Sequence, residues 1–204
     1  REAEAIESIP KRSEFLTLCK DIVARGEKAL VFVKYEPTGE QLTELASQIT
    51  HDGRPVQTAF FHGGLSKNER RELKNRLNSF TREDKIDILI ATDAGGVGLN
   101  LQGANNIINY DSAWNPMVVE QRIGRVHRIG QRRTVHVYNL FSSFGLKNEG
   151  MNDDNLTVDE YINQILEVKL KNIAVRLGMS DKVISETVVS SAEFIRIVMK
   201  RVTQ

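Results

Sequence analysis

The sequence predicts an α/β fold, with a parallel β-sheet covered by helices on both faces and followed by a C-terminal helical extension. Two observations lead to this prediction. Short, continuous apolar runs of strand length alternate with longer segments in which apolar residues recur at helical spacing. Such alternation is typical of sheets whose strands are joined by helical crossovers and are buried on both sides.

Three helices are expected before the last strand of the sheet. The first covers residues 10–26, where apolar side chains form one helical stripe and a glycine supplies a stop. The others cover residues 40–50 and 66–80. The last of these begins with Ser66 as N-cap and has Glu69 three residues later, which is the pattern of a capping box.

Five strands are expected between and after these helices, each rich in apolar and β-branched residues. They cover residues 29–33, 56–61, 86–92, 106–111 and 134–141. In open parallel sheets the chemistry gathers at the carboxyl ends of the strands. We therefore expect functional positions in the three stretches that follow strands: HGG at 62–64, TDAGGVGLN at 92–100 and DSAWNP at 111–116.

The chain is predicted to have three parts. An N-terminal helix at 1–26 packs on a lobe at 27–141, and a loop and helical extension follow at 142–204. Within the extension, a long helix is expected over 157–177 and an amphipathic segment over 190–202. Since the chain does not begin with Met, we expect it to be a piece of a longer protein.

Composition narrows the possible classes of protein. Of the 204 residues, 40% are hydrophobic and 27% are charged, and no apolar run reaches the roughly 18 residues that cross a bilayer. The net charge of +1 does not by itself indicate a nucleic-acid-binding protein. The single cysteine, Cys19, excludes an intramolecular disulfide and fits a reducing compartment. We expect a cytoplasmic, nucleoid-associated protein in a prokaryote, or a nuclear one in a eukaryote.

Two common nucleotide-binding loops are absent from the sequence. The glycines of TDAGGVGLN follow a strand, but the third glycine of a dinucleotide fingerprint would fall at Leu101. No glycine is followed by lysine, so there is no P-loop. A tight turn with positive φ is one explanation of the glycines. Three of them in four positions favour a backbone that approaches a phosphate or a sugar.

The segment QRIGRVHRIGQRRTVH contains five arginines and no acidic residue. Arg122, Arg125 and Arg128 are three residues apart, so in a helix they would share a face that binds a polyanion. The alternative is a solvated helix face. Gly124 and Gly130 weigh against that alternative, because each costs a helix about 1 kcal/mol.

Three stretches together resemble a known family: FFHGGLSKNERRELKNRLNSF, ILIATDAGGVGLNLQGANNIINYDSAWNP and EQRIGRVHRIGQ. In order and spacing they resemble the motifs of the second RecA-like lobe of superfamily 2 helicase-type ATPases, specifically the SWI/SNF-like DNA translocases. The resemblance covers residues 29–141. Gly124, where many eukaryotic remodellers have an acidic residue, makes the last motif more similar to bacterial and archaeal members.

The resemblance implies a two-lobed enzyme that hydrolyses ATP with Mg²⁺, both bound mainly by a first lobe that this chain lacks. It implies that Arg125 and Arg128 are arginine fingers and that Gln121 reaches toward the γ-phosphate. Gly98 and Asn100 would approach the nucleotide. The residues implied to lie near the DNA backbone are His62, Gly63, Gly64, Thr92, Ala94, Gly95 and Gly96.

The partners implied are double-stranded DNA, the N-terminal lobe of the same parent chain and a protein complex that is remodelled, with no membrane. The isolated chain is expected to be inactive. Two alternatives stay open: a non-catalytic module that binds nucleic acid or protein, and a lobe of a helicase that separates strands.

A few other residues allow both a functional and a structural interpretation. Trp114 could stack on a base, although a structural role near the arginine motif is favoured. His127 stands without the carboxylate or cysteine cluster of a metal site, so an orienting hydrogen bond is expected. The basic residues of the helix at 66–80 either contact phosphates or form a solvated face, since Glu69 and Glu72 lie among them.

Overall fold

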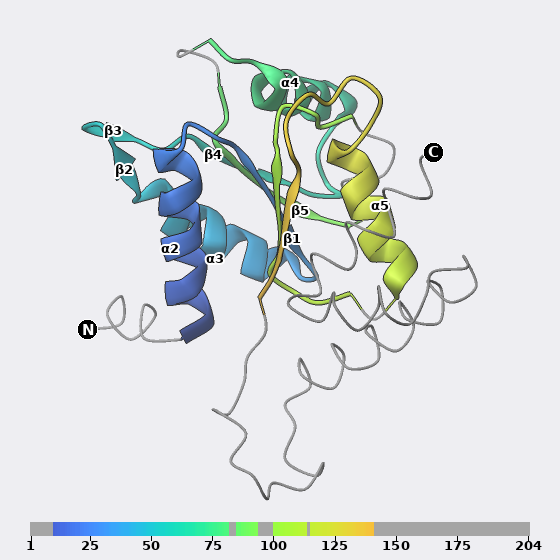
Figure 1. Ribbon diagram of the computed structural model, residues 1–204. Coiled ribbons are helices and arrows are strands. Elements are labelled where there is room, and N and C mark those ends of the chain that lie inside the picture. The colour runs from blue at the N-terminus through green and yellow to red at the C-terminus, as the bar shows by residue number, and fades with distance from the viewer. Residues whose placement is uncertain (1–9, 82–84, 94–99, 114, 141–204) are drawn as a thin grey trace, which may run out of the picture. The chain divides into compact units, whose positions relative to one another are not determined.

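The computed structural model describes residues 10–81, 85–93, 100–113 and 115–140 (Figure 1). Both helices predicted beyond residue 141 lie outside these residues. The described residues up to Asp111 and from Glu120 onward belong to one compact unit, and those from Ser112 to Val119 belong to a second. In the described part of the chain, no helix is long and apolar enough to span a membrane.

Five strands form one parallel sheet in the order β4-β5-β1-β6-β7. They are β1 (Ala29–Val33), β4 (Thr58–Phe61), β5 (Ile88–Thr92), β6 (Asn106–Asn109) and β7 (His136–Asn139). Each lies within a predicted strand, so the predicted parallel sheet is confirmed. The central strands β1 and β5 are buried at every residue, as their continuous apolar sequences predict.

Helices cover both faces of this sheet (Figure 1). They are α2 (Pro10–Ala24), α3 (Glu36–Ser47), α4 (Lys67–Asn78) and α5 (Pro116–Val126). On one face, Phe15 and Ile22 of α2 and Leu42 of α3 share a buried cluster with Val31 of β1. Side chains alternate along a strand, so Phe32 faces the other side, where the guanidinium of an α5 arginine packs on its ring.

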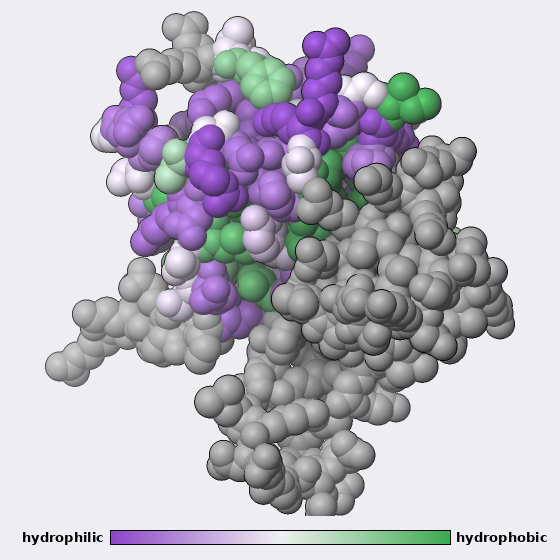
Figure 2. All heavy atoms as spheres, in the orientation of Figure 1, coloured by the Kyte–Doolittle hydropathy of each residue, from purple (hydrophilic) through white to green (hydrophobic). Residues whose placement is uncertain are grey.

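The apolar side chains of β1 and β5 are buried. On the face drawn in Figure 2, hydrophilic residues occupy most of the described surface, and hydrophobic residues show only in small areas between them.

The capping box predicted for α4 is confirmed. The backbone N–H of Glu69 donates to Ser66 Oγ at 3.3 Å, and the backbone N–H of Ser66 donates to Glu69 Oε2 at 2.8 Å. Hydrogen bonding of the Glu69 carboxylate with the side chain and backbone of Ser66 holds the pKa of Glu69 below its usual value. The start of α4 is therefore determined by local sequence.

The helix predicted over 40–50 exists, but both predicted ends are wrong. It begins earlier, at Glu36, with a proline in its first turn, and it ends at Ser47. The chain then forms a short antiparallel hairpin of β2 (Thr50–His51) and β3 (Arg54–Pro55), which was not predicted from the sequence. Asp52 and Gly53 form its turn with φ of 50° and 73°, a conformation for which Asp-Gly is a typical sequence.

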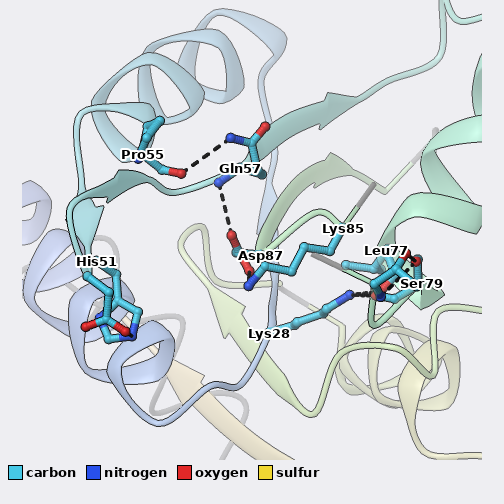
Figure 3. Close-up of polar contacts among 10 residues, drawn as sticks. Lys28, His51, Pro55, Gln57, Leu77, Ser79, Lys85 and Asp87 are labelled. Atoms are coloured by element: carbon cyan, nitrogen blue, oxygen red, sulfur yellow. Dashed lines mark hydrogen bonds and ion pairs between the residues drawn. The ribbon is translucent and has the colours of Figure 1, made fainter. Parts of the chain in front are cut away.

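Lys28, immediately before β1, is buried and holds the C-terminal end of α4 (Figure 3). Its Nζ donates to the backbone oxygen of Leu77 at 2.6 Å and to that of Ser79. These carbonyls lie where a helix has no partners of its own. Burial lowers the pKa of Lys28 to about 8, although the nearby Asp87 carboxylate favours the charged form. Lys28 thus fixes the end of α4 at the amino-terminal edge of the sheet.

Arg122 is a second buried charge, 3% exposed, and it ties α5 to the carboxyl ends of the strands. Its Nε and Nη2 donate to the two carboxylate oxygens of Asp93, each at 2.7 Å. Its Nη1 donates to Asn109 Oδ1 at 2.8 Å and to the backbone oxygen of Asp111 at 3.1 Å. The guanidinium carbon lies 4.9 Å from the centre of the Phe32 ring. One side chain therefore links α5 with the ends of β1, β5 and β6.

We expect the Lys28→Met variant to change how stability depends on pH. Below pH 8 Lys28 is protonated in both the folded and unfolded states. Between about pH 8 and 10.5 the folded state loses the proton first, so the free energy of unfolding rises with pH, by roughly 3 kcal/mol at most. The variant lacks this rise. Urea unfolding at several pH values measures the free energy of unfolding of both proteins, and Lys20→Met, at an exposed position, is the control. The expectation is contradicted if the two free energies differ by the same amount at every pH.

We expect Asp93→Asn to lower the free energy of unfolding by about 1–3 kcal/mol, because Arg122 stays buried with its bidentate partner removed. Arg122→Lys is also expected to lower the free energy of unfolding, since an ammonium cannot donate the parallel pair of hydrogen bonds. The exposed Arg128→Lys change serves as control and is expected to stay within about 0.5 kcal/mol. Denaturant unfolding measures all three, and equal stabilities would show that the pair contributes nothing.

Candidate functional site

Seven of the predicted site residues that the structure describes form two groups at opposite ends of the sheet, and an eighth, Gln121, lies on α5 one turn before Arg125. Those at the carboxyl ends of strands are His62, Gly63, Gly64 and Thr92. Those near the amino-terminal edge are Asn100, Arg125 and Arg128. Four further predicted residues, Ala94, Gly95, Gly96 and Gly98, lie outside the described residues, as does Trp114.

In the first group, the His62 ring closes the turn that follows β4. It stacks on Phe60, with centroids 5.0 Å apart and planes 20° from parallel. The backbone N–H of Gly64 donates to His62 Nδ1 at 3.3 Å, and a Glu36 carboxylate oxygen lies 3.8 Å from the same nitrogen. Gly63 and Gly64 are exposed, and Thr92, at the end of the neighbouring strand β5, is buried.

Arg70 supports this turn from α4, a role that was not predicted from the sequence. Its Nε donates to the backbone oxygen of Leu65 at 2.9 Å, and its Nη2 donates to that of Gly63. Of the basic residues left open as phosphate contacts, Arg70 is therefore engaged with the protein, whereas Lys67 and Arg71 are exposed. The carbonyl that Arg70 contacts lies within the predicted HGG stretch, so Arg70 shapes it.

In the second group, Asn100 lies beside the ends of two helices. Its backbone oxygen accepts from Asn78 Nδ2 at 3.2 Å, at the end of α4. The next residue, Leu101, donates its backbone N–H to the oxygen of Arg125 at 2.9 Å, in the last turn of α5. The expectation that the whole 92–100 stretch lies at the carboxyl ends is therefore wrong for Asn100, because Lys28 ties the end of α4 to the opposite edge. The structure does bring Asn100 next to the predicted arginine fingers.

The two predicted fingers differ in their surroundings. Arg125 is partly buried, and among the described residues its guanidinium has no hydrogen-bond partner. Arg128 is exposed and follows the end of α5, and its Nε donates to the backbone oxygen of Gly124 at 2.8 Å. This bond engages Nε, and among the described residues no hydrogen bond of the two terminal nitrogens is seen. Gln121 is exposed one turn before Arg125.

The prediction that Arg122, Arg125 and Arg128 share one helix face is wrong. Arg122 turns into the protein and is neutralised by Asp93, an acidic residue supplied by the end of another strand. Arg128 lies beyond the helix, so helical spacing does not apply to it. Gly130 also lies beyond the helix, with φ of 100°, and serves a turn. Gly130 therefore costs α5 no stability and is no evidence against a solvated helix face. Gly124 does lie inside α5, and a Cβ added there would meet no other atom within 4 Å.

Two glutamines join the second group, and neither was predicted as a site residue from the sequence. Gln102 Nε2 donates to the backbone oxygen of Ile129 at 2.9 Å. Gln131 Nε2 donates to the backbone oxygens of Gln102 at 3.0 Å and Ala104 at 3.1 Å. They connect the loop that contains Asn100 with the loop that contains Arg128. Gln131 belongs to the EQRIGRVHRIGQ stretch, but its partners are almost thirty residues away, so the motif alone could not show its contacts.

The described residues contain no group of three or more His, Cys, Asp or Glu side chains placed to hold a metal ion. His127, expected to orient its neighbours, is exposed, and its backbone N–H continues the helix by donating to Ile123 at 2.8 Å. Arg125, Arg128 and the exposed backbone N–H groups of Gly63 and Gly64 are donors of a kind that suits an anion.

Comparison with known proteins shows the family of the chain. The sequence matches the family described as helicase conserved C-terminal domain over residues 13–130. It is 32% identical over 190 residues to the uncharacterized ATP-dependent helicase YqhH of Bacillus subtilis (strain 168), covering 93% of this chain and 30% of that protein. It is 34% identical over 158 residues to helicase SWR1 of Debaryomyces hansenii, covering 74% of this chain and 9% of that protein.

A solved structure shares the fold. The C-terminal part of the Fun30 ATPase domain superposes with a TM-score of 0.59 at 24% identity, covering 81% of this chain and 55% of that one. The chain spans 30% or less of the length of the two curated relatives above. The match over residues 13–130, together with the parallel five-stranded sheet, shows that the chain belongs to the helicase conserved C-terminal domain family and is a RecA-like lobe of the kind found in SNF2-like helicases.

Proposed function

We propose that this chain is the second lobe of an ATP-dependent double-stranded DNA translocase and that Arg125 and Arg128 act on the phosphates of ATP. One observation carries the proposal. Of the three arginines in EQRIGRVHRIGQ, Arg122 is neutralised by a carboxylate, whereas the described residues provide no carboxylate for Arg125 or Arg128. Among the described residues, the Arg125 guanidinium and the two terminal nitrogens of Arg128 are thus available to an anion, at the end of a helix held in place by Arg122.

The phosphates would come from outside this lobe. The sequence has no P-loop, so ATP and its Mg²⁺ would be bound by a first lobe of the same parent chain. Mg²⁺ would neutralise charge on the phosphate oxygens there. When the lobes close, Arg125 and Arg128 would stabilise the charge that develops on the transferred phosphoryl group. Gln121, exposed one turn earlier on α5, would reach toward the same phosphate.

Asn100 and Gly98 would approach the nucleotide from the neighbouring loop. The Asn100 amide is already oriented, since Nδ2 donates to Gln102 Oε1 at 3.0 Å and Oδ1 accepts from the Gln102 backbone N–H at 3.3 Å. Its contact with the end of α5, through Leu101 and Arg125, supports a shared site.

The DNA backbone would lie at the other end of the sheet. Gly63 and Gly64 are exposed in a turn that His62 and Arg70 hold, and backbone N–H groups in such turns suit phosphate oxygens. Thr92 ends the adjacent strand β5, and Ala94, Gly95 and Gly96 follow it. ATP and DNA would therefore contact different ends of one lobe. A protein complex moved along the DNA would be a further partner of the parent protein.

We expect the isolated chain to show no DNA-stimulated ATP hydrolysis, because arginine fingers without a P-loop cannot bind and orient the triphosphate. The full-length parent protein is expected to hydrolyse ATP when double-stranded DNA is added. Phosphate release by the two proteins, measured at equal concentration, tests this. Robust turnover by the isolated chain would contradict the two-lobe assignment, and no turnover by the parent would favour a non-catalytic binding module.

In the parent protein, Arg125→Ala and Arg128→Ala are each expected to lower kcat for ATP by about 10³-fold or more, with little change in the Kd for DNA. Arg132→Ala, an exposed arginine of the same segment, is the matched control and should leave both values unchanged. Steady-state ATPase assays and DNA-binding titrations give the two quantities. If DNA affinity and turnover fall together, the arginines bind DNA instead. Strand displacement by the unmodified parent would indicate a strand-separating helicase.

A further inference from the structure

We propose that Gln102 and Gln131 are positioning residues that hold the loop carrying Arg128 against the loop carrying Asn100. This inference rests on the proposed function of Arg128 and adds two residues to which that proposal gives no role. The side chains of Gln102 and Gln131, together with the backbone groups they contact, form a unit that we call the amide clasp.

The loop that carries Arg128 has little else to hold it. Helix α5 ends at Val126, and residues 127–130 are all exposed. Ile129 is fully exposed, so the apolar side chain best suited to anchor the loop contributes no packing. The loop turns back at Gly130, whose φ is 100°, and the N–H of Gln131 donates to the oxygen of Arg128 at 2.9 Å.

Gln131 forms the inner half of the amide clasp. Its Nε2 lies 3.0 Å from the backbone oxygen of Gln102, 3.1 Å from that of Ala104 and 3.4 Å from that of Val126. Its Oε1 accepts from the backbone N–H of Arg133 at 3.2 Å. This network determines the orientation of the amide, because the flipped amide would place Oε1 against three carbonyls. The end of α5 and the loop before β6 are thereby held by one side chain.

Gln102 forms the outer half of the amide clasp. It donates from the loop that contains Asn100 to the loop that contains Arg128, whereas Gln131 donates the other way. Its Nε2 donates to the backbone oxygen of Ile129 at 2.9 Å, and its Oε1 accepts from Asn100 Nδ2 at 3.0 Å. A continuous path of side-chain hydrogen bonds therefore runs from Asn100 to the residue next to Arg128. A shift of either loop would move the other, and a displacement of about 1 Å at a catalytic group can cost about 10²-fold in rate.

Two isosteric changes separate positioning from folding. Gln131→Glu removes the donor and sets carboxylate oxygens against carbonyls, while the acceptor for Arg133 is kept. Gln102→Glu removes the donor to Ile129 and keeps the acceptor for Asn100. In the full-length protein we expect each to lower kcat for ATP by about 10- to 100-fold. The ATP KM and the DNA Kd are expected to stay close to those of the unmodified protein, and Gln102→Glu is expected to keep the thermal midpoint as well. Gln48→Glu, an exposed glutamine elsewhere, is the control.

A double variant with Arg128→Ala gives the deciding measurement. If the amide clasp acts by placing Arg128, adding Gln131→Glu or Gln102→Glu to Arg128→Ala causes little further loss of kcat. Losses that multiply, or single variants with unchanged kcat, would overturn the inference while leaving the proposed function intact. Unchanged turnover in Arg128→Ala alone would instead overturn the proposed function. Should Gln131→Glu unfold the protein, the more peripheral Gln102→Glu decides between these outcomes.

Discussion

The buried guanidinium of Arg122 is the interaction on which the candidate site depends. It is 3% exposed, so it is stable there only because Asp93, Asn109 and the Asp111 carbonyl together satisfy its donors. These acceptors come from the ends of two strands, and the ring of Phe32 from a third lies against it. The helix that carries Arg125 is therefore held to the sheet by a polar contact whose geometry permits little displacement.

The charged residues of the lobe fall into two groups, those that bond within the protein and those at the end of α5. Lys28, Arg70 and Arg122 direct their donors to backbone or side-chain acceptors of the protein itself. Arg125 and Arg128 stand at the end of α5, at the edge of the sheet opposite the turn around His62. The proposed cationic donors and the proposed backbone donors therefore lie at different ends of the sheet.

Much of the fold could be predicted from local sequence, because the signals are local. Short runs rich in apolar and β-branched residues identified the five strands of the described main sheet, and the pair Ser66 and Glu69 identified the start of α4. The hairpin at 50–55 was missed although its Asp-Gly turn is visible, because its strands are two residues long and show no periodicity. The true start of α3 was missed because a proline at a helix start resembles a break.

The sequence by itself determined the family and the identity of the candidate residues, since motif order and the missing P-loop can be read from the linear chain. Only the tertiary structure decided which arginine is neutralised, that Asn100 lies beside α5, and that Gln102 and Gln131 bridge two loops. The physical reason is the same in each case. A hydrogen bond or an ion pair depends on where its acceptor lies in space, and these acceptors lie about thirty residues away along the chain or on another element of the sheet.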